Sequence, residues 1–198
     1  VNSAGCGDFG MLDAVDDAAI ERLFAINAVA PVQLTRALLP QLCSQSAGAI
    51  LNIGSVFGSL GYPGFAAYSA SKFGLRGVSE VLRFDLRQHD IKVSLVCPGG
   101  VDTGLTETIQ IAGVDKGSAS FRKAQARFKK RAVTPDHAAR AILRGVRRNR
   151  YMVYTSPDIF LIFTLQRAFP PGYTAAMRIF NKVANKVLPE AEKARSPR

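Results

Sequence analysis

Tyr68 and Lys72 lie four residues apart in a segment whose apolar residues recur at helical spacing. On a helix, this spacing places both side chains on one face. A phenol with a pKa of about 10 is a weak acid or base at neutral pH, and a neighbouring ammonium would stabilise the phenolate and lower that pKa. The pair therefore predicts a proton-transferring tyrosine, although the same spacing also occurs in ordinary exposed Tyr–Lys pairs.

A third candidate, Ser55, follows an apolar run at residues 49–53 that is bounded by Gly48 and Gly54. Such a run is typical of a strand buried on both faces of a parallel sheet. A hydroxyl in the loop after that strand could hold a carbonyl or alkoxide oxygen beside the tyrosine. A loop serine alone carries little information, so the interpretation rests on Ser55, Tyr68 and Lys72 jointly.

The elements that position these residues follow from the spacing of the apolar residues. Strands at 49–53 and 91–96 flank a helix over 66–88, and a strand–helix–strand unit with short connections gives parallel strands whose carboxyl ends carry the site. The other predicted elements are a helix over 14–42, a polar and partly helical insertion at 104–131, a helix over 135–148 with Thr134 as N-cap, a strand at 151–154, and a helical segment over 157–187 that breaks at 170–172.

Gly5, Gly7 and Gly10 form a literal G-x-G-x-x-G pattern. A phosphate loop of this kind should open a helix at once and be followed about 20 residues later by an acidic residue at a strand end. Here the segment that follows is predicted to be helical throughout, and residues 25–30 contain no acidic side chain. We therefore interpret the glycines as a loop after a strand and not as a pyrophosphate site.

Cysteine and histidine usage limits the metal and redox chemistry. Cys6, Cys43 and Cys97 are far apart and form no C-x-x-C pair, so neither a disulfide framework nor a zinc site is predicted, and a reducing compartment is expected. His89 and His137 are the two histidines of the chain, and no second ligand type clusters near either. No metal site is predicted.

The formal charge of +11 is concentrated in the second half, where residues 99–198 carry 19 basic and 7 acidic side chains. Residues 116–150 hold 12 of those basic side chains and one acidic residue, Asp136. Such clusters can bind nucleic acid. The aromatic residues between 116 and 150 are Phe121 and Phe128, and their spacing on one helical face favours packing over base stacking. No nucleic-acid partner is therefore expected.

Five motifs in order resemble the short-chain dehydrogenase/reductase family over about residues 1–155: Asn2-Ser3-Ala4-Gly5, Asn27, Ser55, Tyr68-Ser69-Ala70-Ser71-Lys72 and Pro98-Gly99-Gly100-Val101-Asp102-Thr103. Ser3 stands where the family prefers Asn. The resemblance implies an α/β fold, a Rossmann-like doubly wound parallel sheet. It further implies that the first strands and the glycine-rich phosphate loop precede Val1, so that the 198-residue chain alone should show no cofactor-dependent turnover.

By this resemblance, residues 1–156 form the C-terminal part of the NAD(P)-binding catalytic domain, residues 157–189 a C-terminal helical extension and residues 190–198 a disordered tail. The implied catalytic residues are Asn27, Ser55, Tyr68 and Lys72, with Asn27 kinking its helix and holding a water that relays protons to Lys72. The implied residues for NAD or NADP are Asn2, Ala4, Gly5, Tyr68, Lys72, Pro98, Gly99, Val101 and Thr103. The residue that selects between NAD and NADP would also precede Val1.

The expected activity is interconversion of an alcohol and a carbonyl by hydride transfer, with Tyr68 exchanging the proton. Two alternatives share the same residues: a nucleotide-sugar epimerase or dehydratase, and a catalytically silent relative that serves as a scaffold or binding partner. The resemblance also implies a homodimer that pairs through the helices at 14–42 and 66–88.

The segment after residue 157 combines apolar side chains such as Phe160 and Phe169 with basic ones such as Arg167 and Arg178. This composition fits either core helices with solvated basic residues or a surface that contacts an anionic membrane. The uninterrupted apolar run at 159–163 is much shorter than the about 20 residues of a membrane span. We expect a lipophilic alcohol or ketone substrate and a cytoplasmic location with peripheral membrane contact.

Overall fold

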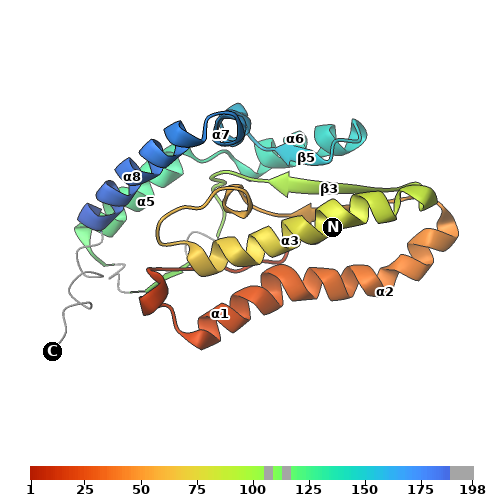
Figure 1. Ribbon diagram of the computed structural model, residues 1–198, viewed down its shortest axis with the longest axis horizontal. Helices are drawn as coiled ribbons and strands as arrows, with labels where there is room; N and C mark the ends of the chain where they lie inside the picture. Colours follow the sequence, from red (N-terminus) through yellow and green to blue (C-terminus); the bar gives the residue numbers. More distant parts are fainter. Residues whose placement is uncertain (105–108, 113–116, 188–198) are drawn as a thin grey trace.

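The computed structural model describes residues 1–104, 109–112 and 117–187 of the chain (Figure 1). Its main sheet contains the strands β2 (Gly48–Ile53), β3 (Ile91–Cys97) and β5 (Met152–Tyr154), all parallel and in the order β2-β3-β5. In the register, Ile53 pairs with Val96 and Leu95 with Met152. The two strands around the long helix are thus parallel neighbours, as the strand–helix–strand pattern predicted.

The start of the chain forms a single parallel bridge, between Asn2 and Asn52, at the free edge of β2. The backbone N–H of Asn2 donates to the carbonyl of Leu51 at 2.8 Å, and Ile53 donates back to the Asn2 carbonyl at 2.9 Å. The Asn2 side chain donates to Thr35 Oγ1 at 3.2 Å and to Asn52 Oδ1 at 2.7 Å. These bonds fix the start of the chain to β2 and to the helix that carries Thr35.

The helix predicted over 14–42 starts and ends later and is not one uniform helix. It consists of α1 (Asp17–Phe24), a π-helical turn (Ala25–Val29) and α2 (Ala30–Gln45), after a separate 3-10 turn at Leu12–Ala14. Asp16 ends the loop because its carboxylate accepts from the N–H of Ala19 at 2.6 Å. The π turn is a local change of the backbone hydrogen bonds from the i→i+4 to the i→i+5 pattern, and the apolar spacing did not indicate it.

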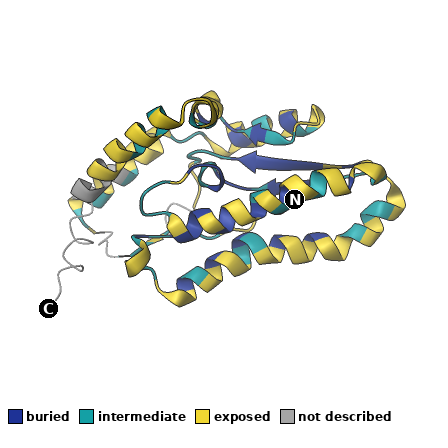
Figure 2. Cartoon of the chain, in the orientation of Figure 1, coloured by how far each residue is buried: buried dark blue, intermediate teal, exposed yellow. Residues whose placement is uncertain are grey.

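Helix α3 (Ala66–Asp85) packs on β3, α2 packs on β2, and α6 (Pro135–Arg147) packs on β5. Thr134 caps α6 as predicted, since its hydroxyl accepts from the N–H of His137 at 3.2 Å. Buried apolar residues between these layers form the core; the cluster under α2 and α3 contains Ile50, Leu86, Ile91 and Val93. Figure 2 shows β3 as a buried strand and the outer faces of the helices as exposed.

Two short segments were not predicted as strands. Asp8–Phe9 (β1) pairs in parallel with Gln110–Ile111 (β4), so the glycine-rich segment runs beside the insertion. Within the insertion, α5 (Ala119–Arg131) is the described helix. The loop between β2 and α3 contains a 3-10 turn at Val56–Gly58.

The C-terminal part contains α7 (Pro157–Ala168) and α8 (Pro170–Val187), which lie across the same end of the molecule as α5 (Figure 1). The break was predicted at 170–172, but it lies at Phe169, and Pro170 already begins α8. A proline fits the first turn of a helix because the N–H it lacks has no partner there. The predicted disordered tail at 190–198 lies outside the described residues.

Asp17–Gln45 meets the length and hydropathy required of a membrane span, with a mean hydropathy of 1.3 in its most apolar window. A core helix of an α/β protein meets the same test. The buried Asn27 and Thr35 of this helix both hydrogen-bond to other segments, and α2 packs on β2. These contacts support its role as a helix that covers the sheet.

Candidate active site

Ser55 lies directly after β2, and the turn that carries it is fastened to the turn after β3. The N–H of Gly54 donates to Val96 at 2.8 Å, and the N–H of Val56 donates to the Pro98 carbonyl at 2.9 Å. Ser55 has extended backbone geometry and caps the following 3-10 turn by accepting from the N–H of Phe57 at 3.2 Å. The carboxyl ends of two neighbouring strands thus meet beside Ser55, as expected for a site in a parallel sheet.

Tyr68 lies in the first turn of α3 and is buried. The Ser55 hydroxyl lies close enough to the Tyr68 phenol to lower the pKa of that phenol. Two phenylalanine rings pack edge-on against the Tyr68 ring, Phe9 with its centroid at 5.1 Å and Phe57 at 6.4 Å. The first-turn position of Tyr68 and the cap position of Ser55 bring the two hydroxyls together, so this part of the sequence prediction is present in the geometry.

Burial raises the pKa of the Tyr68 phenol above its usual value, and the nearby Ser55 hydroxyl offsets this rise only in part. The net shift of the Tyr68 pKa is therefore upward, and the lowering expected from Lys72 stays a prediction. The physical reason is that the aromatic cluster removes the phenol from water, which disfavours the phenolate. The ammonium of Lys72 donates its hydrogen bond to the backbone carbonyl of Ile53 and not to the Tyr68 phenol.

Lys72 is buried, with 5% of its surface exposed, and its ammonium donates to the carbonyl of Ile53 at 3.1 Å. Among the described residues, this carbonyl is its hydrogen-bond acceptor, and no carboxylate pairs with it. Burial lowers the Lys72 pKa from 10.5 to about 8. An ammonium has three donors, so this buried group retains capacity for acceptors that a ligand would bring.

Asn27 lies in the π-helical turn and is fully buried. Its amide donates to the Cys6 carbonyl at 3.0 Å and to Ser71 Oγ at 3.1 Å, while its Oδ1 accepts from the Cys6 N–H at 3.0 Å. The local π geometry matches the implied kink at Asn27. The bonds fasten the segment at Cys6 to α1–α2 and, through Ser71, to the helix of Tyr68 and Lys72.

Gly5 lies between the two catalytic candidates Asn27 and Lys72. A Cβ atom at Gly5 would be 3.3 Å from Asn27 Oδ1 and 3.5 Å from Lys72 Nζ. The exposed Ala4 and Gly5 therefore border the polar group, whereas the side chain of Asn2 is used inside the fold by Thr35 and Asn52. An exposed glycine beside a buried ammonium with spare donors fits a ligand that carries hydroxyl groups, as the ribose of NAD or NADP does.

The segment after β3 continues the same edge of the sheet. Gly99 donates to Thr155 Oγ1 at 3.3 Å, and a Cβ atom at Gly99 would be 2.7 Å from Ile159 Cδ1 in α7. Val101 forms a parallel bridge with Val133. Thr103 is exposed and lies beyond that bridge. Pro98 and Gly99 thus border the turn of Ser55, whereas Val101 and Thr103 lie farther along the chain beside the insertion.

Three contributors to this site were not predicted. Ser71 links Asn27 to Tyr68 because its hydroxyl accepts from the Asn27 amide and donates to the Tyr68 carbonyl at 2.7 Å. Cys6 supplies the backbone partners of Asn27, and Thr155 supports Gly99 from the turn after β5. Ser71 lies three residues from Tyr68 on the helix, so helical spacing could have identified it; the other two depend on tertiary contacts.

The rejected glycine pattern has no helix after it that a phosphate loop would open. Gly10 ends β1 with φ of +146°, its N–H donates to Gly64 at 2.8 Å, and α1 begins only at Asp17. The acidic residue within the pattern, Asp8, pairs with Arg22 at 3.0 Å. The segment serves as a strand and loop that pack beside α1 and α3, in agreement with the interpretation from sequence.

Known proteins match this chain across the described fold. The profile of the short chain dehydrogenase family matches residues 1–112. SadH of Mycobacterium tuberculosis, which is named as an oxidoreductase, is 32% identical over 178 residues, covering 87% of this chain and 62% of SadH.

Two solved structures are similar in fold and sequence. A short-chain dehydrogenase from Streptomyces avermitilis has a TM-score of 0.71 at 27% identity, covering 93% of this chain and 69% of that one. A short-chain dehydrogenase from Sphingobium yanoikuyae, in complex with NADPH, has a TM-score of 0.68 at 25% identity, covering 88% and 63%. The chain thus spans under two thirds of the length of SadH, and it belongs to the short-chain dehydrogenase/reductase family of oxidoreductases.

Proposed function

We propose that the protein containing this chain interconverts an alcohol and a carbonyl with NAD or NADP as the hydride carrier. The observation that supports this proposal most directly is the proximity of the Ser55 hydroxyl to the Tyr68 phenol at the carboxyl end of β2, beside the buried ammonium of Lys72. Membership of the family and the NADPH bound to the Sphingobium relative support the choice of cofactor class.

In this proposal each residue has a separate task. Ser55 holds the substrate oxygen, and Tyr68 donates a proton to it during reduction or accepts one during oxidation. Lys72 holds hydroxyl groups of the nucleotide, and Asn27 keeps the segment at Gly5 and Cys6 in place beside it. The bound nicotinamide supplies or accepts the hydride. The raised pKa of Tyr68 keeps its phenol protonated at neutral pH, which suits the donor role in reduction.

The test compares Tyr68→Phe and Ser55→Ala with a matched control, Tyr151→Phe. The buried Tyr151 hydroxyl has no hydrogen-bond partner among the described residues, so its removal leaves the contacts of the site intact. Oxidation of NADH and NADPH with a panel of ketones should fall on the order of 10²–10⁴-fold for Tyr68→Phe. Full activity in Tyr68→Phe, or no turnover by the unaltered whole protein that contains this chain, would contradict the proposal and favour a silent scaffold.

We further propose that the substrate is lipophilic. Aromatic rings surround the Tyr68 phenol: Phe9 and Phe65 have centroids 4.2 Å apart, and Phe57 and Phe65 4.5 Å apart. An apolar wall of this kind contributes binding energy in proportion to the apolar area that a ligand buries. For a series of methyl ketones, kcat/KM should rise with chain length, and a Phe57→Ala variant should lose that dependence. A kcat/KM that does not change with the chain length of the ketone would contradict the proposal.

A homodimer through α2 and α3 is also proposed. Large apolar side chains are exposed on both helices, including Leu34 and Leu38 on α2 and Val81 and Phe84 on α3. Burying such side chains between two copies would stabilise the assembly. Light scattering should give twice the protomer mass, and Leu38→Asp with Phe84→Asp should give the monomer mass. A monomer before substitution would contradict this assignment.

Finally, we propose a cytoplasmic location with peripheral membrane contact through α7 and α8. Leu161, Leu165 and Ile179 are exposed on these helices, and the exposed Arg167 and Arg178 accompany them. An apolar face beside cations is suited to an anionic lipid surface, and the three free cysteines fit a reducing compartment. Flotation with phosphatidylglycerol vesicles should be lost in Leu161→Glu and retained in Leu12→Glu. Equal flotation of both variants would count against the proposal.

A further inference from the structure

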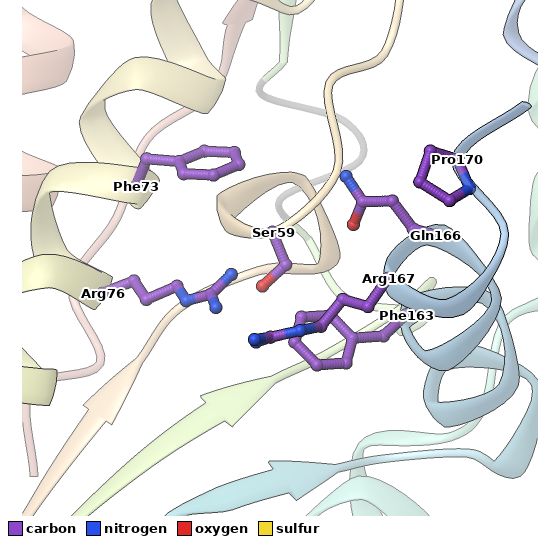
Figure 3. Close-up of a pocket in the computed structure, with 7 residues that line it drawn as sticks. All are labelled: Ser59, Phe73, Arg76, Phe163, Gln166, Arg167 and Pro170. Atoms are coloured by element: carbon purple, nitrogen blue, oxygen red, sulfur yellow. The ribbon is translucent and has the colours of Figure 1, made fainter. Parts of the chain in front are cut away.

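A cavity lies outside the Ser55–Tyr68–Lys72 group, between α3, the turn after β2 and α7. Its volume is about 380 Å³, within the range of small-molecule sites, about 300–1,000 Å³. Figure 3 shows its side chains: Phe73 and Arg76 come from α3, Ser59 from the turn, and Phe163, Gln166 and Arg167 from α7. None of these residues belongs to the proposed catalytic group.

Two guanidinium groups enter this cavity from opposite walls. Arg76 points in from α3 and Arg167 from α7 (Figure 3). Both pack over the ring of Phe163, with guanidinium carbons 5.3 Å and 5.9 Å from its centroid. In the described part of the chain, neither lies within 4 Å of a carboxylate. Glu80, one helical turn after Arg76, is exposed and does not pair with it. Among the residues that the structure describes, the cavity therefore carries two positive charges without a counterion.

A buried hydroxyl lies between these two charges. Ser59 is 5% exposed, and its Oγ makes no hydrogen bond of normal geometry with the described residues, although it lies near the thiol of Cys97, a weak donor. A buried polar atom without a partner costs free energy. Gln166 adds an amide to the same wall in Figure 3. An acceptor atom in the cavity would satisfy these groups together.

We propose that this cavity binds a small anion that carries an apolar group, a carboxylate or a phosphate monoester. Guanidinium groups bind both oxyanions with paired hydrogen bonds, and Ser59 and Gln166 supply neutral donors. Phe73 and Phe163 provide apolar surface for the attached group. Because Arg76 and Arg167 belong to different helices, the bound anion would also link α7 to α3.

The test is calorimetric titration of the protein with phenyl phosphate and benzoate, with benzyl alcohol as the neutral analogue and inorganic phosphate as the bare anion. Both aromatic anions should bind at least tenfold more tightly than benzyl alcohol, and phenyl phosphate more tightly than inorganic phosphate. The same anions should raise the melting temperature, since they bind the folded state. Equal binding of benzoate and benzyl alcohol, or no saturable binding of either anion, would overturn the proposal.

Substitutions of the two arginines test whether the anions bind in this cavity. Arg76→Gln and Arg167→Gln should each weaken benzoate binding at least tenfold, whereas Arg178→Gln, which removes an exposed cation of α8 outside the cavity, should leave it unchanged. Tyr68→Phe should also leave it unchanged, which separates this cavity from the proposed catalytic site. If Arg178→Gln weakened benzoate binding to the same degree, the binding would reflect the general positive charge of the surface and not this cavity. If an arginine variant does not fold, the comparison of benzoate with benzyl alcohol in the unaltered protein still tests whether the cavity prefers an anion.

Discussion

Asn27 and Cys6 exchange two hydrogen bonds, one in each direction. The Asn27 amide donates to the Cys6 carbonyl at 3.0 Å, and the Cys6 N–H donates to Asn27 Oδ1 at the same distance. This is the pattern of a strand pair made by one side chain, and it holds the segment at Gly5 beside Lys72. The π-helical turn places the side chain at the required position, so the irregularity in the helix has a consequence for the site.

Replacing Asn27 with Leu should destabilise the fold and displace the segment at Gly5. Cys6 would lose partners for both its backbone N–H and carbonyl, and Ser71 would lose a donor. Unpaired groups of this kind cost about 1–3 kcal/mol each when buried, and Cys6 is only half-buried, so we expect a loss of about 2–3 kcal/mol. Urea denaturation monitored by circular dichroism measures this loss of unfolding free energy.

The matched control is Gln33→Leu, an exposed amide six residues later on the same helical segment. Its effect should stay within about 0.5 kcal/mol, as is usual for exposed positions. If Asn27→Leu were no more harmful than Gln33→Leu, the two bonds to Cys6 would contribute little to the fold.

Lys72 should make stability depend on alkaline pH. Its pKa is lowered by burial from 10.5 to about 8, so the unfolded chain binds a proton between those values that the folded chain has lost. Stability therefore rises as the pH increases from about 8 to about 10.5, by about 3 kcal/mol at most. The unfolding free energy of the unaltered protein should therefore rise across this pH range relative to that of Lys72→Met, which lacks the titrating ammonium.

The comparison for Lys72 is Lys92→Met, which removes an exposed lysine of β3. Tyrosine ionisation affects all three proteins alike, so it cancels in the differences. The same pH dependence for both variants, or a difference between Lys72→Met and the unaltered protein that is constant over the range, would show that burial does not shift the Lys72 pKa.

Ser55→Ala should raise the pKa of Tyr68 further. The Ser55 hydroxyl lowers this pKa against the effects of burial and of Cys6, and its removal leaves only the influences that raise the pKa. The shift can be measured by NMR titration of tyrosine labelled with ¹³C at Cζ, with the Tyr68 signal identified from Tyr68→Phe. Ser69→Ala is the control, because the buried Ser69 hydroxyl has no partner among the described residues. A shift of equal size in Ser69→Ala would refute the role of Ser55.

The sequence predicted the elements that depend on local spacing and on short connections. Tyr68 and Lys72 could be placed on one face because four residues are about one helical turn, and Thr134 could be assigned as a cap because a hydroxyl before Pro135 has few other roles. Ser55 could be placed beside them because parallel strands present their carboxyl ends at one edge of the sheet.

Features that depend on distant contacts could not be predicted in this way. The direction of the Tyr68 pKa shift depends on Phe9 and Phe57, which only the tertiary fold brings to the phenol. The pairing of β1 with β4 joins segments about a hundred residues apart, and neither is long enough to show alternation. Arg76 and Arg167 are likewise remote in sequence, so the charge of their cavity appears only in the structure.

Gly99 and Ile159 provide a test of where α7 lies. A Cβ atom at Gly99 would be 2.7 Å from Ile159 Cδ1, closer than van der Waals contact allows, so Gly99→Ala should cost about 1–3 kcal/mol through overpacking. Ile159→Val removes that Cδ1 atom and should cost about 0.5–1.5 kcal/mol alone. In the double variant one of the two close contacts is gone, although Ile159 Cγ1 would still lie 2.9 Å from the new methyl group, so the total loss should be smaller than the sum of the single losses.

Gly77→Ala combined with Ile159→Val is the reference pair for this cycle, because a Cβ atom at Gly77 would meet nothing within 4 Å. In α3 this substitution should stabilise the helix by about 0.5–1 kcal/mol, and its effect should add to that of Ile159→Val. Urea denaturation of the six proteins gives both coupling energies. Additive losses in the Gly99 pair would mean that α7 does not rest on the turn after β3. A coupling energy in the Gly99–Ile159 pair but not in the Gly77–Ile159 pair would mean that α7 helps to hold Gly99. Gly99 in turn borders the edge of the sheet where Ser55 and Tyr68 meet.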